Sequence, residues 1–183
     1  MEALIRGRRA AAIFLGIVLL GMADARAQQA AEPTVKAAFL YKFTGYVEWP
    51  ASAFAHPDSP IVIGVIGAED VAAELERIVP GRRVNERGVA VKRLREGESP
   101  RGTHLLFVGR AEAGARAMLR LAQQLGILAV TETERGLDNG ATINFVIADE
   151  RVGFEVSLAS AERSGLRISS RMLAVARRVV PRP

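Results

Sequence analysis

Ile61–Ile66 (IVIGVI) is a short apolar run rich in β-branched residues, and it stands between Pro60 and Gly67. A run of this length and composition is typical of a buried β-strand. The segment that follows, Glu69–Val79, has acidic residues in its first turn and ends at a Pro-Gly pair, as a helix does. A buried strand that turns through one glycine into a helix indicates an α/β fold.

The same alternation of strands and helices continues along the chain. Further strands are expected at Val89–Leu94, His104–Val108, Ile127–Thr131, Ala141–Ala148 and Val152–Leu158. Helices are expected at Ala111–Leu125, at Ala159–Ser164 and from Ser169 or Ser170 to Val180. Three polar residues join the last two strands, which favours a hairpin, and the alternation in its second strand predicts one solvent-exposed face. The sequence therefore predicts a single α/β domain with a mixed β-sheet and helices on both faces.

The first 27 residues are expected to lie outside this domain. Three arginines precede an uncharged apolar run, Ala10–Met22, and two overlapping small-x-small sites follow it within Ala23–Ala27. This is the layout of a secretory signal peptide, and the apolar run is shorter than the ~20 residues of a membrane-spanning helix. We therefore expect cleavage after residue 27, export from the cytoplasm and a folded domain over residues 28–183.

Composition narrows the functions that this domain can have. The chain carries 25 basic and 20 acidic side chains, of which four and two fall in residues 1–27, so the remainder has 21 and 18 and a net charge of +3. The basic residues are scattered among acids, without the positive stripe and stacking aromatics of a nucleic-acid interface, so no nucleic-acid partner is expected. The absence of cysteine excludes disulfides and zinc–thiolate sites, and two histidines, His56 and His104, leave little room for a multi-histidine metal site.

Motifs for catalysis are missing from the chain. It contains no nucleophile elbow, no Walker loop and no zinc-protease motif. Glu132 and Glu134 could mimic a paired carboxylate, but a catalytic pair needs its partners on opposite sides of a substrate, so we interpret them as solvated loop residues. His104 begins an apolar strand, where a lone histidine is more often hydrogen-bonded and partly buried than a base or a ligand. We predict no enzymatic activity, no catalytic residue, no cofactor and no metal site.

The segment Thr34–Val47 is predicted to form a helix with an aromatic stripe. Phe39, Phe43 and Tyr46 recur at helical spacing, and Val35 extends the stripe. Aromatic residues at this spacing usually pack inward, so we expect this face to belong to the core.

Tyr41, Glu48 and Trp49 project differently from that stripe and are candidates for binding. Trp49 is the only tryptophan of the chain and precedes Pro50, which closes the helical segment. Two interpretations of Trp49 stay open: an exposed binding residue, or a cover over the edge of the core.

Two long motifs in this sequence resemble the YfiR/HmsC family of periplasmic proteins. Val35–Pro50 (VKAAFLYKFTGYVEWP) is similar to the family's opening K-A-A-F-L-Y-x-F-x-x-x-V-E-W-P. Phe154–Ala176 (FEVSLASAERSGLRISSRMLAVA) is similar to its ending R-F-E-V/I-N…A…A-G-L-x-I-S-S-x-L-L-x-L-A. The segments between them follow in the expected order, so the resemblance spans essentially the whole chain after residue 27. The chain departs from the pattern at Gly153, where the family often has arginine, and in lacking the cysteine pairs that would allow redox control.

The resemblance implies a regulator without enzymatic activity in the periplasm. Such proteins hold the periplasmic sensory domain of an inner-membrane diguanylate cyclase in an inhibited state, so that cyclic di-GMP and biofilm formation stay low. An outer-membrane lipoprotein can draw the repressor away. Because family members occur beside other membrane sensors, a histidine kinase stays open as the partner. Association of two copies of this chain as a homodimer also stays open.

We hypothesise that the partner-binding surface combines Tyr41, Glu48 and Trp49 with Arg167. These residues lie in the two motifs, and they supply the aromatic and charged groups that dominate interfaces. Ser169 and Ser170 are assigned to capping the last helix. The alternative from another class is a small-ligand-binding module with its crevice at the carboxyl ends of the strands.

Overall fold

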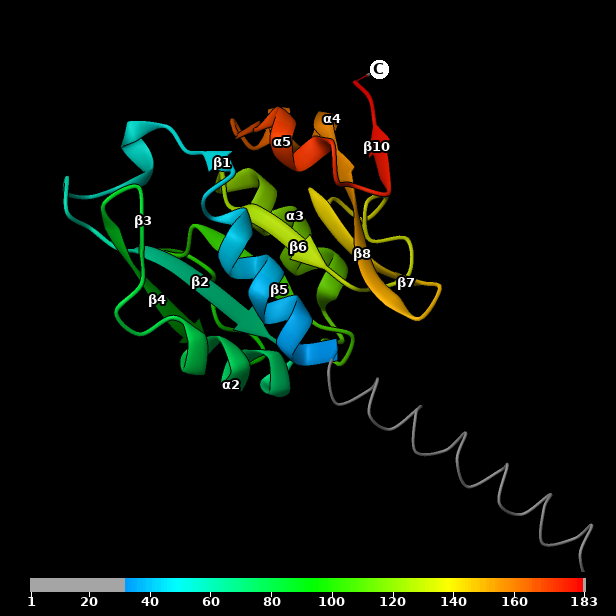
Figure 1. Ribbon diagram of the computed structural model, residues 1–183, viewed down its shortest axis with the longest axis horizontal. Helices are drawn as coiled ribbons and strands as arrows, with labels where there is room; N and C mark the ends of the chain where they lie inside the picture. The colour runs from blue at the N-terminus through cyan, green and yellow to red at the C-terminus, as the bar shows by residue number, and fades with distance from the viewer. Residues whose placement is uncertain (1–31, 183) are drawn as a thin grey trace, which may run out of the picture.

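The computed structural model describes residues 32–182, so the predicted signal peptide lies outside the described residues. Residues 32–43 form an N-terminal helix. The elements after it are β1 (Val47–Glu48), the 3₁₀ helix η1 (Ala51–Ala53), β2 (Ile61–Ile66), α2 (Glu69–Ile78), β3 (Arg83–Val84), β4 (Arg87–Arg93), β5 (Leu105–Val108), α3 (Ala115–Gln124), β6 (Leu128–Thr131), β7 (Ile143–Ala148), β8 (Arg151–Ser157), α4 (Leu158–Arg163), β9 (Arg167–Ile168), α5 (Ser170–Leu173) and β10 (Arg178–Val180). Figure 1 shows the N-terminal helix, in blue, crossing in front of the main sheet, with α3 behind it.

The main sheet has eight strands among the described residues, in the order β10-β8-β7-β6-β5-β2-β4-β3. The strands from β4 to β7 in this order pair in parallel, whereas β8 is antiparallel to β7 and β3 is antiparallel to β4. Parallel neighbours need crossover connections, and α2 and α3 supply two of them. The prediction of an α/β fold with a mixed sheet is confirmed.

Strand β5 shows why both faces of this sheet are covered. Leu105 and Phe107 belong to the core beneath the N-terminal helix and α2, while Leu106 and Val108 belong to the core beneath α3. All four side chains are fully buried. A strand covered on both faces has no solvent side for polar residues, which is why it is a continuous apolar run in the sequence.

The loops that follow β2 and β5 are in direct contact with each other. A Cβ atom on Gly109 would lie 2.2 Å from the carbonyl oxygen of Gly67. These loops stand at the point where the strand order reverses, the usual ligand crevice of an open α/β sheet. Backbone atoms of the two loops therefore occupy this point of the sheet edge.

The prediction that the last helix continues to Val180 is wrong for its second half. Helix α5 ends at Leu173, and Arg178–Val180 instead form β10, which pairs in parallel with β8 at the edge of the sheet. The adjacent residues Val179 and Val180 are β-branched and favour a strand. The edge of β8 offers backbone groups that this segment satisfies, so tertiary pairing overrides the helical spacing of the apolar residues.

The aromatic stripe of the N-terminal helix is shifted from the predicted one. Phe43 is 2% exposed, but Tyr46 and Val35 are each 39% exposed, so their assignment to the core is wrong. The helical residues end at 43 and the chain turns, so that Tyr46 no longer continues the helical face. The buried face instead runs through Lys36, Leu40 and Phe43.

The predicted solvent face of β8 is largely covered by the C-terminal segment. Arg177 lies across Gly153, where a Cβ atom would come within 2.4 Å of the guanidinium Nε. Glu155 forms a two-pronged ion pair with Arg178 of β10, at 2.9 and 2.8 Å. Ser157 is buried, and its hydroxyl accepts a hydrogen bond from the backbone N–H of Ser160 in α4. The alternation in the sequence is real, but the addition of β10 removes the solvent from that face.

Candidate functional site

The two family-like motifs meet in a small second sheet. Strand β1 pairs antiparallel with β9, with Val47 opposite Ile168 and Glu48 opposite Arg167. The backbone N–H of Ser169 extends this pairing by donating to the carbonyl oxygen of Tyr46 at 2.9 Å. The start of the domain is thereby joined to its last quarter.

Glu48 and Arg167 form an exposed ion pair on this small sheet. The Glu48 Oε2 and Arg167 Nε atoms are 3.7 Å apart, and the side chains are 74% and 86% exposed. Alternation along the strands turns Val47 into the core and Glu48 outward. A pair so exposed contributes little to stability, because water screens it. Both side chains are therefore available to a partner.

Trp49 follows Glu48 in the chain but turns inward. Its indole Nε1 donates to the carbonyl oxygen of His104 at 3.2 Å, and its ring meets the imidazole edge-on at a centroid distance of 6.2 Å. The side chain is half-buried and packs against the main core. Of the two interpretations left open by the sequence, the geometry favours the cover over the core edge.

Tyr41 makes its contacts at β3. The phenol donates to the carbonyl oxygen of Arg83 at 3.4 Å, and the guanidinium carbon of Arg82 lies 5.3 Å from the ring centroid. The structure thus brings together Glu48 and Arg167, places Trp49 beside them as a half-buried support, and directs Tyr41 toward different neighbours.

His104 is partly buried and hydrogen-bonded, as the sequence predicted. Its ring is stacked on Phe54, with centroids 4.5 Å apart, and the residue is 8% exposed. Burial lowers the pKa of the imidazole below its ordinary value of 6.5; the hydrogen bond to Ala53 opposes this shift, and the nearby charge of Arg87 adds to it. The ring is therefore neutral at pH 7.

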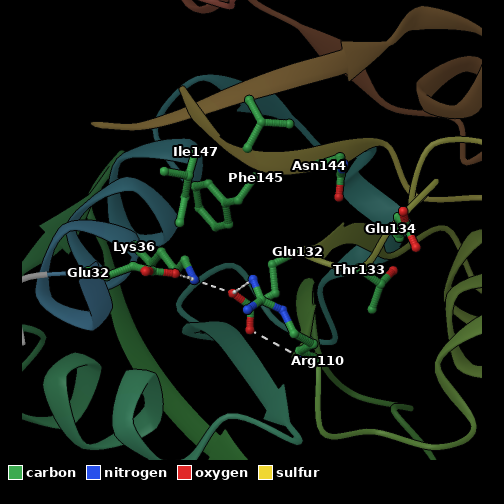
Figure 2. Close-up of a pocket in the computed structure, with 10 residues that line it drawn as sticks. Glu32, Lys36, Arg110, Glu132, Thr133, Glu134, Asn144, Phe145 and Ile147 are labelled. Carbon is green, nitrogen blue, oxygen red and sulfur yellow. Dashed lines mark hydrogen bonds and ion pairs between the residues drawn. The ribbon is translucent and has the colours of Figure 1, made fainter. Parts of the chain in front are cut away.

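A cavity of about 780 Å³ opens beside the carboxyl ends of β5 and β6. One wall carries charged groups and the other is apolar. The lining residues are Glu32, Lys36, Arg110, Glu132, Thr133, Glu134, Asn144, Phe145, Val146 and Ile147. Figure 2 shows Lys36 and Arg110 pointing toward Glu132, with Phe145 and Ile147 on the neighbouring wall.

A buried lysine organises the charged wall. Lys36 is 4% exposed, and its ammonium pairs with the carboxylates of Glu32 and Glu132. Glu132 also accepts the backbone N–H of Arg110 at 3.2 Å and lies 3.8 Å from its guanidinium. A charge removed from water needs such partners, so the cluster ties the N-terminal helix to the end of β6.

The interpretation of Glu132 as a solvated loop residue is wrong, whereas Glu134 is exposed as expected. The side chain of Glu132 is 11% exposed because Lys36, which the sequence analysis did not single out, lies against it. The sequence did carry a sign of this buried contact, because Lys36 lies on the same helical face as Leu40 and Phe43. A charge on an apolar face calls for a buried partner of opposite sign.

The sequence matches one known protein family over most of its length. The family model described as DUF4154, YfiR/HmsC-like, matches residues 33–177. The chain belongs to the YfiR/HmsC-like family. That match includes both segments that meet at β1 and β9, as well as the helix that carries Lys36. No curated protein matches the sequence.

Within residues 32–182, no helix is long and apolar enough to cross a membrane. In the same part of the chain, no three side chains of the metal-binding types gather closely enough to hold an ion.

Proposed function

We propose that this protein is a periplasmic, non-enzymatic regulator that binds the periplasmic sensory domain of an inner-membrane diguanylate cyclase. Binding holds the cyclase in its inhibited state and so lowers cyclic di-GMP and biofilm formation. Membership of the YfiR/HmsC-like family, which is regulatory and non-catalytic, supports this proposal. The observation that carries it is the exposed Glu48–Arg167 pair, which exists only because the two family-like motifs pair with each other.

The mechanism is a shift of population. A partner that binds only the inactive conformer of the cyclase lowers the active fraction by its differential affinity for the two states. Moving an equilibrium from mostly active to mostly inactive needs several kcal/mol of such preference. The regulator therefore has to present a preformed surface, and a surface built on paired strands meets this need.

Glu48 and Arg167 are the residues of that surface with direct access to a partner. Their opposite charges can pair with complementary groups across an interface, where they set orientation and register. Tyr46, which is 39% exposed and whose backbone belongs to the same pairing, adds aromatic area of the kind that interfaces prefer. Trp49 supports this surface from beneath.

Charge reversal tests the proposal. Glu48→Arg and Arg167→Glu should each leave a folded protein and raise cyclic di-GMP in the cell to the level of a deletion strain. Arg182→Glu is the matched control, because Arg182 forms a similarly exposed pair with Glu162 at 3.4 Å. Full repression by both Glu48→Arg and Arg167→Glu would place the interface elsewhere.

The partner and the compartment need their own experiment. Pull-down of the protein from solubilised membranes should recover a diguanylate cyclase, and mass spectrometry of the exported protein should show that it begins at Gln28. Recovery of a histidine kinase would instead identify that class as the partner. If deletion of the gene left cyclic di-GMP unchanged, the regulation of a cyclase would be refuted.

A second candidate function, binding of a small ligand, is favoured by the cavity beside β5 and β6. Its volume of about 780 Å³ lies in the range of natural ligand sites, and it combines the apolar Ile147, 55% exposed, with charged groups. A screen of small metabolites by thermal shift would test this function. A hit that Ile147→Glu abolishes would support it, and the absence of any hit would count against it.

A further inference from the structure

The imidazole of His104 replaces part of the backbone pairing between β2 and β5. Its Nδ1 accepts the backbone N–H of Val62 at 3.1 Å, and the backbone N–H of His104 donates to the carbonyl oxygen of Val62 at 2.8 Å. Because an amide N–H can only donate, Nδ1 has to be without a proton in this arrangement. The other ring nitrogen, Nε2, lies 3.1 Å from the carbonyl oxygen of Ala53 and therefore carries the proton that it donates.

Through these contacts the histidine holds the segment 49–54 against the sheet. Its Nε2 bonds to Ala53, its ring stacks on Phe54, and its carbonyl oxygen accepts the indole N–H of Trp49. The segment begins directly after Glu48, at the end of the small sheet. The imidazole and the backbone carbonyl of this one residue thus fasten the segment that adjoins the exposed Glu48–Arg167 pair.

Protonation of the ring is incompatible with this arrangement. A proton on Nδ1 would face the N–H of Val62, so two donors would oppose each other at hydrogen-bond distance and one bond would be lost. Two cations lie near the ring: Arg87, whose guanidinium carbon lies 3.8 Å from the centroid of the Phe54 ring and whose charge lowers the pKa of the imidazole, and Arg101, which lines the cleft beside Trp49 and His104. Neither can stabilise an imidazolium, so the charged ring is more stable in water than in its buried position.

We propose that His104 is a pH-sensitive latch: the neutral ring holds the segment 49–54 in place, and protonation releases the segment and weakens binding of the partner at Glu48 and Arg167. The last step rests on the proposed function, whereas the release of the segment is a property of this chain alone. Histidine is the side chain whose charge changes between pH 5 and 8, so the latch responds to mild acidification. Because opening of the latch takes up one proton, the equilibrium constant for opening rises at most about ten-fold for each unit by which the pH falls.

The single tryptophan allows the release to be measured directly. On acidification from pH 7.5 to 5, the emission of Trp49 should shift to longer wavelength, with a midpoint below 6.5, while circular dichroism shows that the domain stays folded. His104→Gln should remove the shift, because glutamine does not titrate. His56→Gln is the matched control, since His56 is the only other histidine and lies in the exposed loop before β2. Emission that is independent of pH in the wild type, or a shift that persists in His104→Gln, would refute the latch.

Nuclear magnetic resonance of the wild-type protein covers the case in which His104→Gln does not fold. The latch requires the Nε2–H tautomer at pH 7.5 and faster amide exchange in residues 49–54 once His104 is protonated. Detection of the Nδ1–H tautomer, or protection of that segment that does not change on protonation, would overturn it.

Binding of the cyclase sensory domain then separates the two proposals. If Trp49 emission responds to pH and affinity falls in parallel for the wild type but not for His104→Gln, the latch controls the interface. If emission responds while the affinity of a bound partner stays constant, coupling of the latch to the interface is refuted. If no partner binds at any pH, the proposed function fails while the release of the segment stands.

Discussion

Replacing Phe43 with alanine should remove much of the stability of this domain. The side chain is 2% exposed, and its ring lies 5.8 Å from that of Phe39, 5.9 Å from Phe145 and 5.0 Å from Phe154, measured between centroids. It therefore joins the N-terminal helix to β7 and β8. Truncation of a buried phenylalanine costs about 3–5 kcal/mol, and the loss of three ring contacts places Phe43→Ala toward the upper end. The total free energy of unfolding of a domain is only about 5–15 kcal/mol.

Urea unfolding followed by circular dichroism and by Trp49 emission measures this loss. The midpoint should fall sharply, with little change in the slope of the free energy against denaturant. Tyr46→Ala is the matched control, because it removes an aromatic ring three positions away that is 39% exposed, and it should cost less than about 1 kcal/mol. A similar loss for both variants would refute the argument that the buried face runs through Phe43 and excludes Tyr46.

Three further predictions concern other parts of the fold. Lys36→Met should lower the free energy of unfolding by about 3–5 kcal/mol, because it leaves the Glu132 carboxylate buried without its ammonium partner. The double variant Lys36→Met, Glu132→Leu should recover much of this loss, and chemical denaturation of both variants measures the difference. Gly109→Ala should lower the melting temperature by several degrees, since its Cβ would overlap the backbone of Gly67; an unchanged value would contradict the close approach of these loops. Because the folded chain holds His104 with a lowered pKa, it binds fewer protons than the unfolded chain, so the free energy of unfolding should fall as the pH drops below about 6.5. This pH dependence should be weaker in His104→Gln than in the wild type.

The centre of the sheet could be predicted from the sequence because its local and tertiary preferences agree. The strands at residues 61–66 and 105–108 are buried on both faces, so their apolar runs carry an unambiguous signal. The hairpin was predictable because three polar residues separate two strand-like segments. In the structure Asp149 and Glu150 form its turn with positive φ angles of 51° and 58°.

The predictions failed where a distant segment decides the local structure. Val179 and Val180 fall within the predicted last helix, and pairing with the edge of β8 makes them a strand instead. Glu132 looks like a surface residue until Lys36, 96 positions earlier, is placed against it. The pairing of β1 with β9 was not predicted either, because two-residue strands are too short to leave a pattern in the sequence. The grouping of Glu48 with Arg167 rested on the two motifs alone, and the structure places these two residues opposite each other.

The joining of β1 to β9 also determines the order in which this chain can fold. The N-terminal helix packs on Phe145 and Phe154, and Val47 of β1 lies opposite Ile168, so each of these contacts joins residues far apart in the sequence. Contacts between segments so far apart close a long loop, and the entropy of that loop has to be overcome before the contacts stabilise anything. The helix therefore stays without its core until β7 and β8 have joined it, and a truncation before β7 would leave the aromatic residues at the start of the domain exposed to aggregation.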